Sequence, residues 1–464
     1  MTDIFLRSAD WLITVDPSRR IIKDGAIAIQ GDRIVAVGKT QELEPQHSSA
    51  RQIIDARGKV VLPGLIDCHI HTAFQLARGL ADEVSAQRFL FERMYPYEGL
   101  LEEEENYWSA KLCVLELLRN GVTTFIDAGN YFPQATARVV GETGMRCVIS
   151  KSAMDIAKSP FGELPPRFLE TTEQAVEREE EVVKQWNGCY DGRVRAWFQF
   201  RGIPNSSDQL VTRLKELADR YKTGIQTHAC FARDTVEACK TKFGFTEIER
   251  LGRLGALGPN LLLVHNGWIG PHEVESVRTH DCKIVAAPSS SLHNGYGNLL
   301  MGMAPEFLEM GLAVGLGSDH ASSGIVDLVQ EMFLVSTVYK EVRLNTMVMP
   351  PERVVEMATI NGARCILWEN EIGSIEVGKK ADVTMFNTLT PQWQPLYNPV
   401  ANLVYSATGA SVDTVICDGK VLMEGRQLKT LKEDEIYREV ARLMPGILKK
   451  TNLEEKIKPL WPVV

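Results

Sequence analysis

The sequence has no long hydrophobic run. It contains no stretch of about 18 consecutive apolar residues, the length that a helix needs to cross a bilayer. Residues 1–15 carry Asp3, Arg7 and Asp10 within their apolar stretch, whereas a secretory signal has an uninterrupted apolar core. We therefore expect a cytoplasmic protein with no membrane partner.

The sequence also lacks paired cysteines and an excess of basic residues. Its nine cysteines are an odd number and none forms a Cys-x-x-Cys pair, which argues against a disulfide framework. Lysine and arginine total 51 residues against 60 aspartates and glutamates, so the formal net charge is -9. Nucleic-acid binders carry a basic surface, and we therefore expect no nucleic-acid partner.

Alternating strand-like and helix-like segments fill the middle of the chain. Amphipathic stretches such as residues 104–118 and 209–221 separate most of the strand-like runs. Eight strand-like runs end near residues 69, 127, 150, 200, 228, 265, 287 and 317. Eight such units predict a closed (β/α)8 TIM barrel. An open doubly wound sheet is the alternative, but it would normally carry a glycine-rich phosphate loop after its first strand, and none occurs there.

Both ends of the chain favour short strands joined by tight turns. Alternating runs flank Gly31-Asp32 near the start and Asp418-Gly419 near the end, so each end contains a predicted hairpin. Neither end is large enough to bury a core alone. We expect an α/β protein in which both ends build one small β-sandwich. Its parts are residues 1–58 and residues 371–464, the latter with a terminal helix, and residues 59–370 form the barrel.

Histidines gather at the predicted carboxyl ends of the barrel strands, where this fold carries its chemistry. His69 and His71 are two residues apart on a strand and therefore point to the same face. His228 ends the fifth strand, His265 ends the sixth, and Asp319 follows the eighth. Any one of these residues alone is more often structural. Together they indicate a site for a divalent ion, which imidazole and carboxylate groups bind well.

This order of residues resembles the amidohydrolase superfamily along nearly the whole chain. The resemblance rests on residues 63–67 leading into His69-x-His71, on the later donors in their order, and on the segment 373–382. It implies that one ion per chain is held by His69, His71, His228 and Asp319. The fourth strand has no lysine that would bridge a second ion. Zinc is the expected metal, with iron, cobalt or manganese as alternatives, and such relatives commonly form homo-oligomers.

The resemblance also implies roles in catalysis. Asp319 would accept a proton from a water that the ion acidifies, and His265 would orient that water or polarise the substrate. Independently of the resemblance, Arg201 ends the fourth strand, and its permanent positive charge would stabilise developing negative charge in the active site. A structural salt bridge at the barrel rim is the equal alternative for this residue. His320 directly follows Asp319 and is expected to approach the site.

The expected substrate follows from Phe231. Many relatives that deaminate rings carry a glutamate three residues after the fifth-strand histidine, and phenylalanine stands there. We therefore expect hydrolysis of an amide, urea or (thio)carbamate on a small apolar or aryl substrate, as in the phenylurea and thiocarbamate hydrolases that the chain resembles. Deamination or dechlorination of a heterocycle is the alternative, and a non-catalytic scaffold is a third possibility. The expected pocket residues are Phe231, Trp268, His293 and Tyr296.

Overall fold

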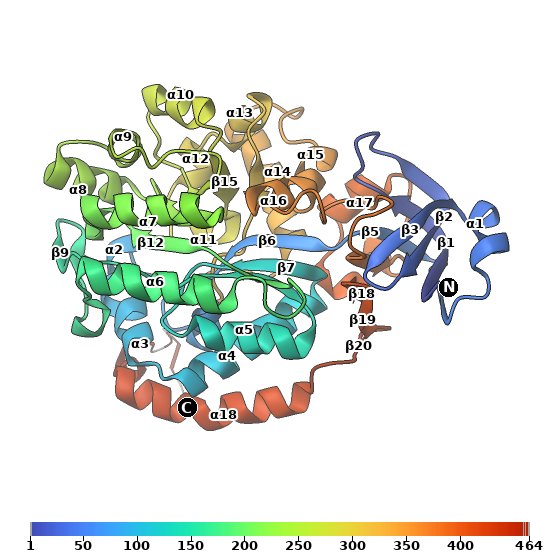
Figure 1. The fold of residues 1–464 in the computed structure, drawn as a ribbon, viewed down its shortest axis with the longest axis horizontal. Helices are drawn as coiled ribbons and strands as arrows, with labels where there is room; N and C mark the ends of the chain where they lie inside the picture. The colour runs from blue at the N-terminus through green and yellow to red at the C-terminus, as the bar shows by residue number, and fades with distance from the viewer. Residues whose placement is uncertain (1, 458, 460, 463–464) are drawn as a thin grey trace.

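The computed structural model describes residues 2–457, 459 and 461–462, which form a barrel with a β-sheet domain against one side (Figure 1). The expected α/β fold of a TIM barrel with a separate sheet is confirmed. Within the described residues, no helix is long and apolar enough to span a membrane.

Parallel strands form the barrel in two hydrogen-bonded ladders. The first ladder is β6 (Leu65–Ile70), β7 (Val122–Asp127), β8 (Arg146–Ile149) and β11 (Val194–Ala196). The second ladder is β12 (Phe198–Gly202), β13 (Ile225–Ala229), β14 (Leu261–His265), β15 (Lys283–Ala286) and β16 (Val314–Leu316). Trp197 separates β11 from β12, which together make the fourth barrel strand, and its backbone N–H donates to the carbonyl of Ile149 at 2.9 Å.

Helices surround the barrel because each turns an apolar stripe inward. The helix α7 (Asp208–Tyr221) buries Leu210, Leu214 and Leu217, and the hydroxyl of Ser207 caps its start by accepting from the N–H of Leu210 at 3.0 Å. The other principal barrel helices are α4 (Glu103–Arg119), α5 (Pro133–Thr143), α6 (Thr172–Trp186), α8 (Arg233–Phe243), α9 (Glu247–Arg253), α10 (Pro271–Thr279), α14 (Leu328–Val342), α15 (Pro351–Met357) and α16 (Ile360–Cys365).

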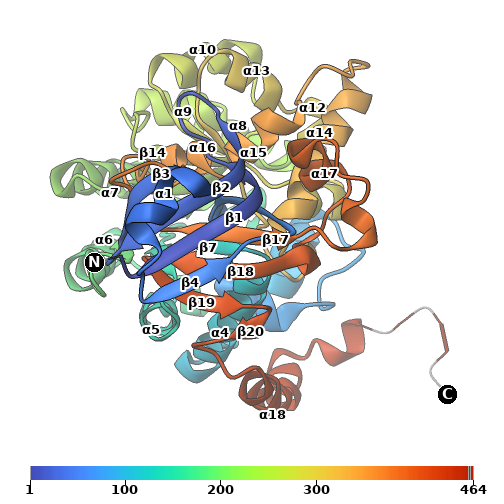
Figure 2. The ribbon, with the colours of Figure 1, turned by 90° about the vertical axis from the view of Figure 1, so that its right-hand side faces the viewer.

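Strands from both chain ends share one sheet, whose face is seen in Figure 2. Strand β5 (Lys59–Pro63) pairs antiparallel with β17 (Val383–Asn387), so that the two ends of the chain meet in the middle of the sheet. The two predicted hairpins are present as β2 (Ile21–Gln30) with β3 (Arg33–Lys39) and as β18 (Val412–Cys417) with β19 (Lys420–Glu424). The remaining strands of the sheet are β1 (Ile4–Ile13), β4 (Gln52–Asp55) and β20 (Gln427–Leu428).

The two parts of the molecule are joined by buried charge and by a terminal helix. Arg146 at the start of β8 donates to the carboxylates of Asp382 and Asp418, which belong to the sheet domain. Helix α18 (Glu433–Thr451) runs beneath α3 (Tyr95–Leu100) and α4 (Figure 1). Its Leu443 and Ile447 pack with the segment η1 (Thr72–Ala77), which directly follows the first barrel strand. The terminal helix therefore supports a loop next to the candidate site.

Candidate metal and active site

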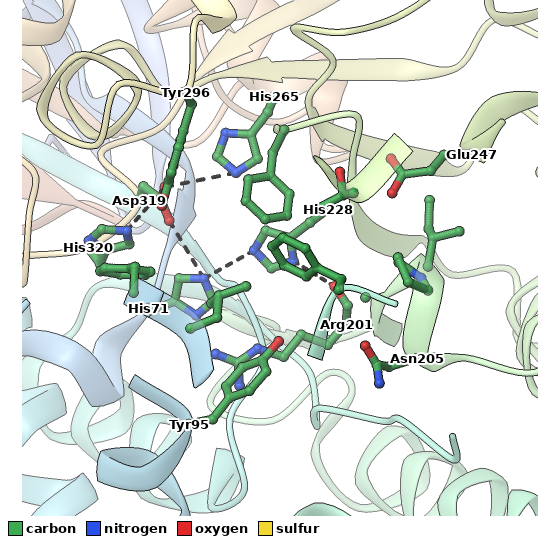
Figure 3. Close-up of a pocket in the computed structure, with 18 of the residues that line it drawn as sticks. His71, Tyr95, Arg201, Asn205, His228, Glu247, His265, Tyr296, Asp319 and His320 are labelled. Carbon is green, nitrogen blue, oxygen red and sulfur yellow. Dashed lines mark hydrogen bonds and ion pairs between the residues drawn. The ribbon is translucent and has the colours of Figure 1, made fainter. Parts of the chain in front are cut away.

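Nitrogen and oxygen donors converge at the carboxyl ends of four barrel strands. His69 and His71 come from the end of β6, His228 from β13, His265 from β14, and Asp319 from just beyond β16. The donor atoms of His69, His71 and His228 lie within 4.8 Å of one another, and so do those of His69, His265 and Asp319. Figure 3 shows that the labelled members of this group point toward one another.

Short distances define the cluster. The Nε2 atoms of His71 and His228 are 3.2 Å apart. Oδ1 of Asp319 lies 3.3 Å from Nε2 of His69 and 3.6 Å from Nε2 of His71, and its Oδ2 lies 3.9 Å from Nε2 of His265. Such spacing around a common centre is what a small divalent ion requires, because each ligand atom lies about 2 Å from the metal.

Barrel closure brings Asp319 to the first strand. The N–H of Asp319 donates to the carbonyl of His69 at 2.8 Å, and the N–H of His71 donates to the carbonyl of Asp319 at 2.6 Å. Gly317 permits this approach, because a Cβ there would lie 2.8 Å from the Cβ of His69. Asp67, which is fully buried, accepts from the N–H of His69 at 3.1 Å and the hydroxyl of Ser318 at 2.5 Å, which fixes the two strand ends together.

Backbone strain also marks this cluster. His265 has φ 80° and Asp319 has φ 64°, in the left-handed region that residues other than glycine rarely adopt. Each such residue costs on the order of 1–3 kcal/mol, and strain of this kind concentrates at functional sites. The fold therefore holds both side chains in directions that relaxed strand geometry would not give.

The donor set fits a divalent ion. Nε2 of His69, which faces Asp319 across the centre of the cluster, is buried without a hydrogen-bond partner. Unpaired buried polar atoms are costly and rare in native proteins unless a ligand or an ion satisfies them. Three histidines and one aspartate match the ligand chemistry of zinc and of other divalent transition metals.

The protonation states suit metal binding as well. Burial lowers the pKa of His71 and of His228 well below the usual value, and it lowers the pKa of His265 to about 3. Burial alone would raise the pKa of Asp319, but His320 and the neighbouring histidines outweigh it and hold that pKa well below its usual value. At neutral pH the histidines are thus neutral and the aspartate charged, which are the forms that bind metals.

A pocket that is open to solvent leads to this cluster. Besides His71, His228, His265 and Asp319, it is lined by His320 and by a largely aromatic wall. The wall comprises Phe74, Phe89, Leu90, Tyr95, Phe161, Phe231 and Tyr296. The rings of Phe231 and Tyr296 lie 5.4 Å apart, and those of Phe231 and His265 lie 5.8 Å apart. The pocket is therefore apolar on its sides and polar at its base.

Arg201 is placed at the pocket but its charge is paired. Its Nη1 donates to Glu98 at 2.5 Å and to the hydroxyl of Ser152 at 3.2 Å, and its side chain is 3% exposed. The carbonyl of Arg201 accepts from Nδ1 of His228 at 2.8 Å, which fixes the orientation of that imidazole. Its backbone thus supports the metal site directly, whereas its guanidinium belongs to a buried ion pair.

Two expected pocket residues lie elsewhere. Trp268 donates its indole N–H to the carbonyl of Tyr296 at 2.7 Å, so it supports the wall from behind. His293 ends α11 (Pro288–His293), and its Nε2 forms an ion pair with Asp82 at 3.1 Å; its side chain is 37% exposed. Asp82 lies on another loop, and its ion pair with His293 holds that side chain away from the pocket. The sequence did not indicate this contact. Phe231 and Tyr296 line the pocket, and so does His320.

Several lining residues were missed by sequence reasoning, and Glu247 is the most consequential. It begins α9 and is fully buried beside the pocket (Figure 3). Asn205, Thr235 and Phe161 also line the pocket. The only local sign of Glu247 is its place after Thr246, a helix-capping residue, and acids are common in first turns for reasons unrelated to function.

Comparisons with known proteins agree on the family. The profile of the Amidohydrolase family matches residues 60–422, and that of an imidazolonepropionase-like composite domain from bacteria matches residues 25–47. The chain is 34% identical over 446 residues to a 5'-deoxyadenosine deaminase of Methanobrevibacter smithii, covering 95% of this chain and 98% of that protein. It is 34% identical over 428 residues to a 5-methylthioadenosine/S-adenosylhomocysteine deaminase of Moorella thermoacetica, covering 91% and 95% respectively.

Solved structures share the fold. An adenosine deaminase from Xanthomonas campestris with bound zinc has a TM-score of 0.89 at 22% identity, covering 97% of this chain and 99% of that one. An atrazine chlorohydrolase from Arthrobacter aurescens in complex with zinc has a TM-score of 0.85 at 23% identity, covering 95% and 100%.

These relatives overturn the expected substrate. The expectation of amide, urea or (thio)carbamate hydrolysis on a phenylurea-like substrate is wrong, because the similar curated proteins are named as nucleoside deaminases. That expectation rested on Phe231 standing where many ring deaminases carry an acid. The physical flaw is that a proton donor must reach the substrate in space, and it need not stand at a fixed distance along the chain.

Proposed function

Because this chain belongs to the amidohydrolase family, we propose that it is a metal-dependent deaminase of the adenine ring in 5'-substituted adenosines. It acts hydrolytically on carbon–nitrogen bonds other than peptide bonds. The observation that carries the proposal is the relationship to 5'-deoxyadenosine and 5-methylthioadenosine deaminases over almost the whole chain, together with a complete set of metal-ligand residues.

The shape and polarity of the pocket support a planar, uncharged substrate. Phe231, Tyr296 and Phe161 offer ring faces and edges to a heterocycle, and aromatic contacts favour flat ligands. The guanidinium of Arg201 is paired with Glu98, so that side of the pocket carries little net charge. An adenosine whose 5' position bears an apolar group matches this lining.

Each residue of the site has its own role in deamination. His69, His71, His228 and Asp319 would hold a divalent ion, and such an ion would supply the positive charge that makes a water molecule acidic near neutral pH. Asp319 accepts the proton of that water and delivers it to the departing amino group, and the hydroxyl of Ser290 orients its Oδ2 from 2.5 Å. His265, which is neutral, directs the water toward the ring carbon.

Ammonia release provides the test. Purified, zinc-loaded protein is incubated with 5'-deoxyadenosine, 5'-methylthioadenosine, S-adenosylhomocysteine and adenosine, and ammonia and the ultraviolet spectrum of the oxo-purine product are followed. We expect turnover of the first two compounds with a higher kcat/KM than of adenosine, whose 5' hydroxyl meets an apolar wall.

A matched pair of variants shows that the activity belongs to this site. His69→Ala removes one donor from the cluster and should abolish ammonia release, whereas His280→Ala, an exposed histidine at the end of α10, should leave it unchanged. Absence of ammonia from every aminopurine, with metal bound and the fold intact, would overturn the proposal.

A further inference from the structure

Deamination of an adenine ring requires an acid, and the position where many related deaminases carry one holds no acid in this sequence. When water adds to the carbon that bears the amino group, the adjacent ring nitrogen gains an electron pair and must be protonated. The position three residues after His228 holds Phe231, which has no proton to give. Asp234 lies on α8 with its side chain exposed, so it does not replace a buried acid.

The pocket nevertheless contains a second carboxylic acid. Among the described residues that line it, Glu247 and Asp319 alone carry carboxylates, and Asp319 is committed to the metal cluster. Glu247 stands 19 positions beyond His228 in the sequence, at the first residue of α9. Figure 3 shows its carboxylate directed toward the side of the pocket that His228 lines.

Hydrogen bonding places Glu247 at the same strand end that Phe231 occupies. The backbone N–H of Cys230, the residue between the end of β13 and Phe231, donates to Oε2 of Glu247. Glu247 is therefore hydrogen-bonded to the loop in which many related deaminases carry their acid, although Glu247 itself belongs to α9. Glu247 is 1% exposed, so bulk water does not compete for the proton of its carboxyl group.

We propose that Glu247 is the catalytic acid that protonates the ring nitrogen during deamination, taking over the role for which Phe231 is unsuited. This inference rests on the proposed function. The titratable groups around Glu247 are Cys230 at the end of β13, Cys239 on α8 and Glu273 on α10. Burial raises the pKa of Glu247 to about 7, with the charge of Glu273 as a further cause, so a large fraction of the carboxyl group is protonated near neutral pH.

The proton balance closes with this assignment. One proton of the attacking water goes to Asp319 as the new carbon–oxygen bond forms, and the ring nitrogen takes the proton of Glu247. The carbon–nitrogen bond to the amino group then breaks, and that group leaves as ammonia with the proton held by Asp319. The remaining hydroxyl proton returns to Glu247, so that one water and one aminopurine give one oxo-purine and one ammonia.

Three variants test the assignment. Glu247→Gln keeps the shape and the acceptor for the N–H of Cys230 but removes the proton; we expect kcat to fall by about 10²–10⁴-fold with KM within a few fold. Glu179→Gln is the matched control, because Glu179 is also a buried glutamate that accepts a backbone N–H, that of Gln199 at 3.3 Å, and it does not line the pocket; its kcat should stay within threefold of the wild type. Phe231→Glu in the Glu247→Gln background restores an acid from the adjacent position and should recover at least tenfold in kcat.

The outcomes separate the two proposals. If the wild type releases ammonia from 5'-deoxyadenosine and Glu247→Gln retains kcat within threefold, the role of Glu247 is refuted while the deaminase function stands. If the wild type releases no ammonia, both the deaminase function and the role of Glu247 are refuted. Should Glu247→Gln not fold, as judged by circular dichroism and zinc content, Glu247→Asp moves the acid back by one methylene; a kcat equal to that of the wild type would then refute the role.

Discussion

The guanidinium of Arg201 and the carboxylate of Glu98 form an ion pair in which the side chains are 3% and 2% exposed. Arg201 comes from the fourth barrel strand and Glu98 from α3, in the long segment after the first strand. The guanidinium also lies over the rings of Phe74 and Tyr95, at 5.5 and 5.2 Å from their centres. This pair joins the loop above the pocket to the strand that supports His228.

Breaking this ion pair should reduce the stability of the fold more than it reduces metal binding. We expect Arg201→Ala to lower the free energy of unfolding by about 3–5 kcal/mol, because Glu98 is left buried without its partner. The backbone carbonyl that holds His228 persists in this variant, so zinc content should stay near one per chain. Urea unfolding with zinc analysis measures both. Arg442→Ala, in which the lost ion pairs are exposed at the surface, should leave the free energy of unfolding nearly unchanged. A zinc loss without destabilisation would contradict this account.

Asp319→Asn should separate folding from chemistry. The amide can still present an oxygen to the ion but cannot accept the proton of water, so kcat should fall by at least about 10²-fold. Steady-state kinetics on protein of verified zinc content is the measurement. Asp234→Asn, an exposed acid on α8, serves as the control and should retain wild-type turnover. Near-normal turnover of Asp319→Asn with zinc bound would exclude Asp319 as the base.

Metal content should be close to one divalent ion per chain. Chelation should abolish turnover and lower the melting temperature, since an ion present at 100 times its Kd stabilises the folded state by about 2.7 kcal/mol. Elemental analysis and thermal melts before and after re-addition of zinc provide the check. His69→Ala should lose both the ion and the zinc-dependent rise in melting temperature. Two ions per chain, both needed for turnover, would refute the single-ion site.

Phe231 should act through substrate binding. Phe231→Ala removes a ring that contacts Tyr296 and Phe161 and faces His265, so we expect KM to rise by about tenfold with a smaller change in kcat. Phe231→Leu keeps much of the apolar surface, so its KM should lie between those of the wild type and Phe231→Ala. An unchanged KM in Phe231→Ala would show that the substrate does not reach this wall.

The pH dependence of turnover should report Glu247. Because its pKa is raised to about 7, kcat of the wild type should decline as pH rises through about 7, and Glu247→Gln should lose that decline. The free energy of unfolding should depend on pH in the same direction. Because the folded protein holds this proton more tightly than the unfolded chain, the stabilisation that the protonated Glu247 provides is full below pH 4.5 and is lost as pH rises through about 7. A wild-type profile that is flat from pH 6 to 9 would contradict the assignment.

The barrel and the convergence of the candidate metal-binding residues follow from local patterns, whereas the assignment of four of them as ligands followed from the family resemblance. Residues at i and i+2 of a strand share a face, which is why His69 and His71 are predictable as a pair. Parallel strands of a barrel present all their carboxyl ends at one rim, so His228, His265 and Asp319 converge once eight strands are recognised. Periodicity along the chain is sufficient for this step, because closure of the barrel then fixes which rim each residue faces.

The pocket beyond those ligands was decided by tertiary structure. Phe231 lines the pocket but led to the wrong substrate class, because the acid that completes the lining comes from Glu247, 16 positions further on, at the start of α9. The sequence left open whether Arg201 acts in catalysis or forms a salt bridge, and only the fold brings Glu98 of α3 against it. In the same way, Asp82 forms an ion pair with His293 at a distance from the pocket. Contacts between loops and helices distant in sequence have no periodic signature, so burial and charge pairing at these residues appear only when the chain is folded.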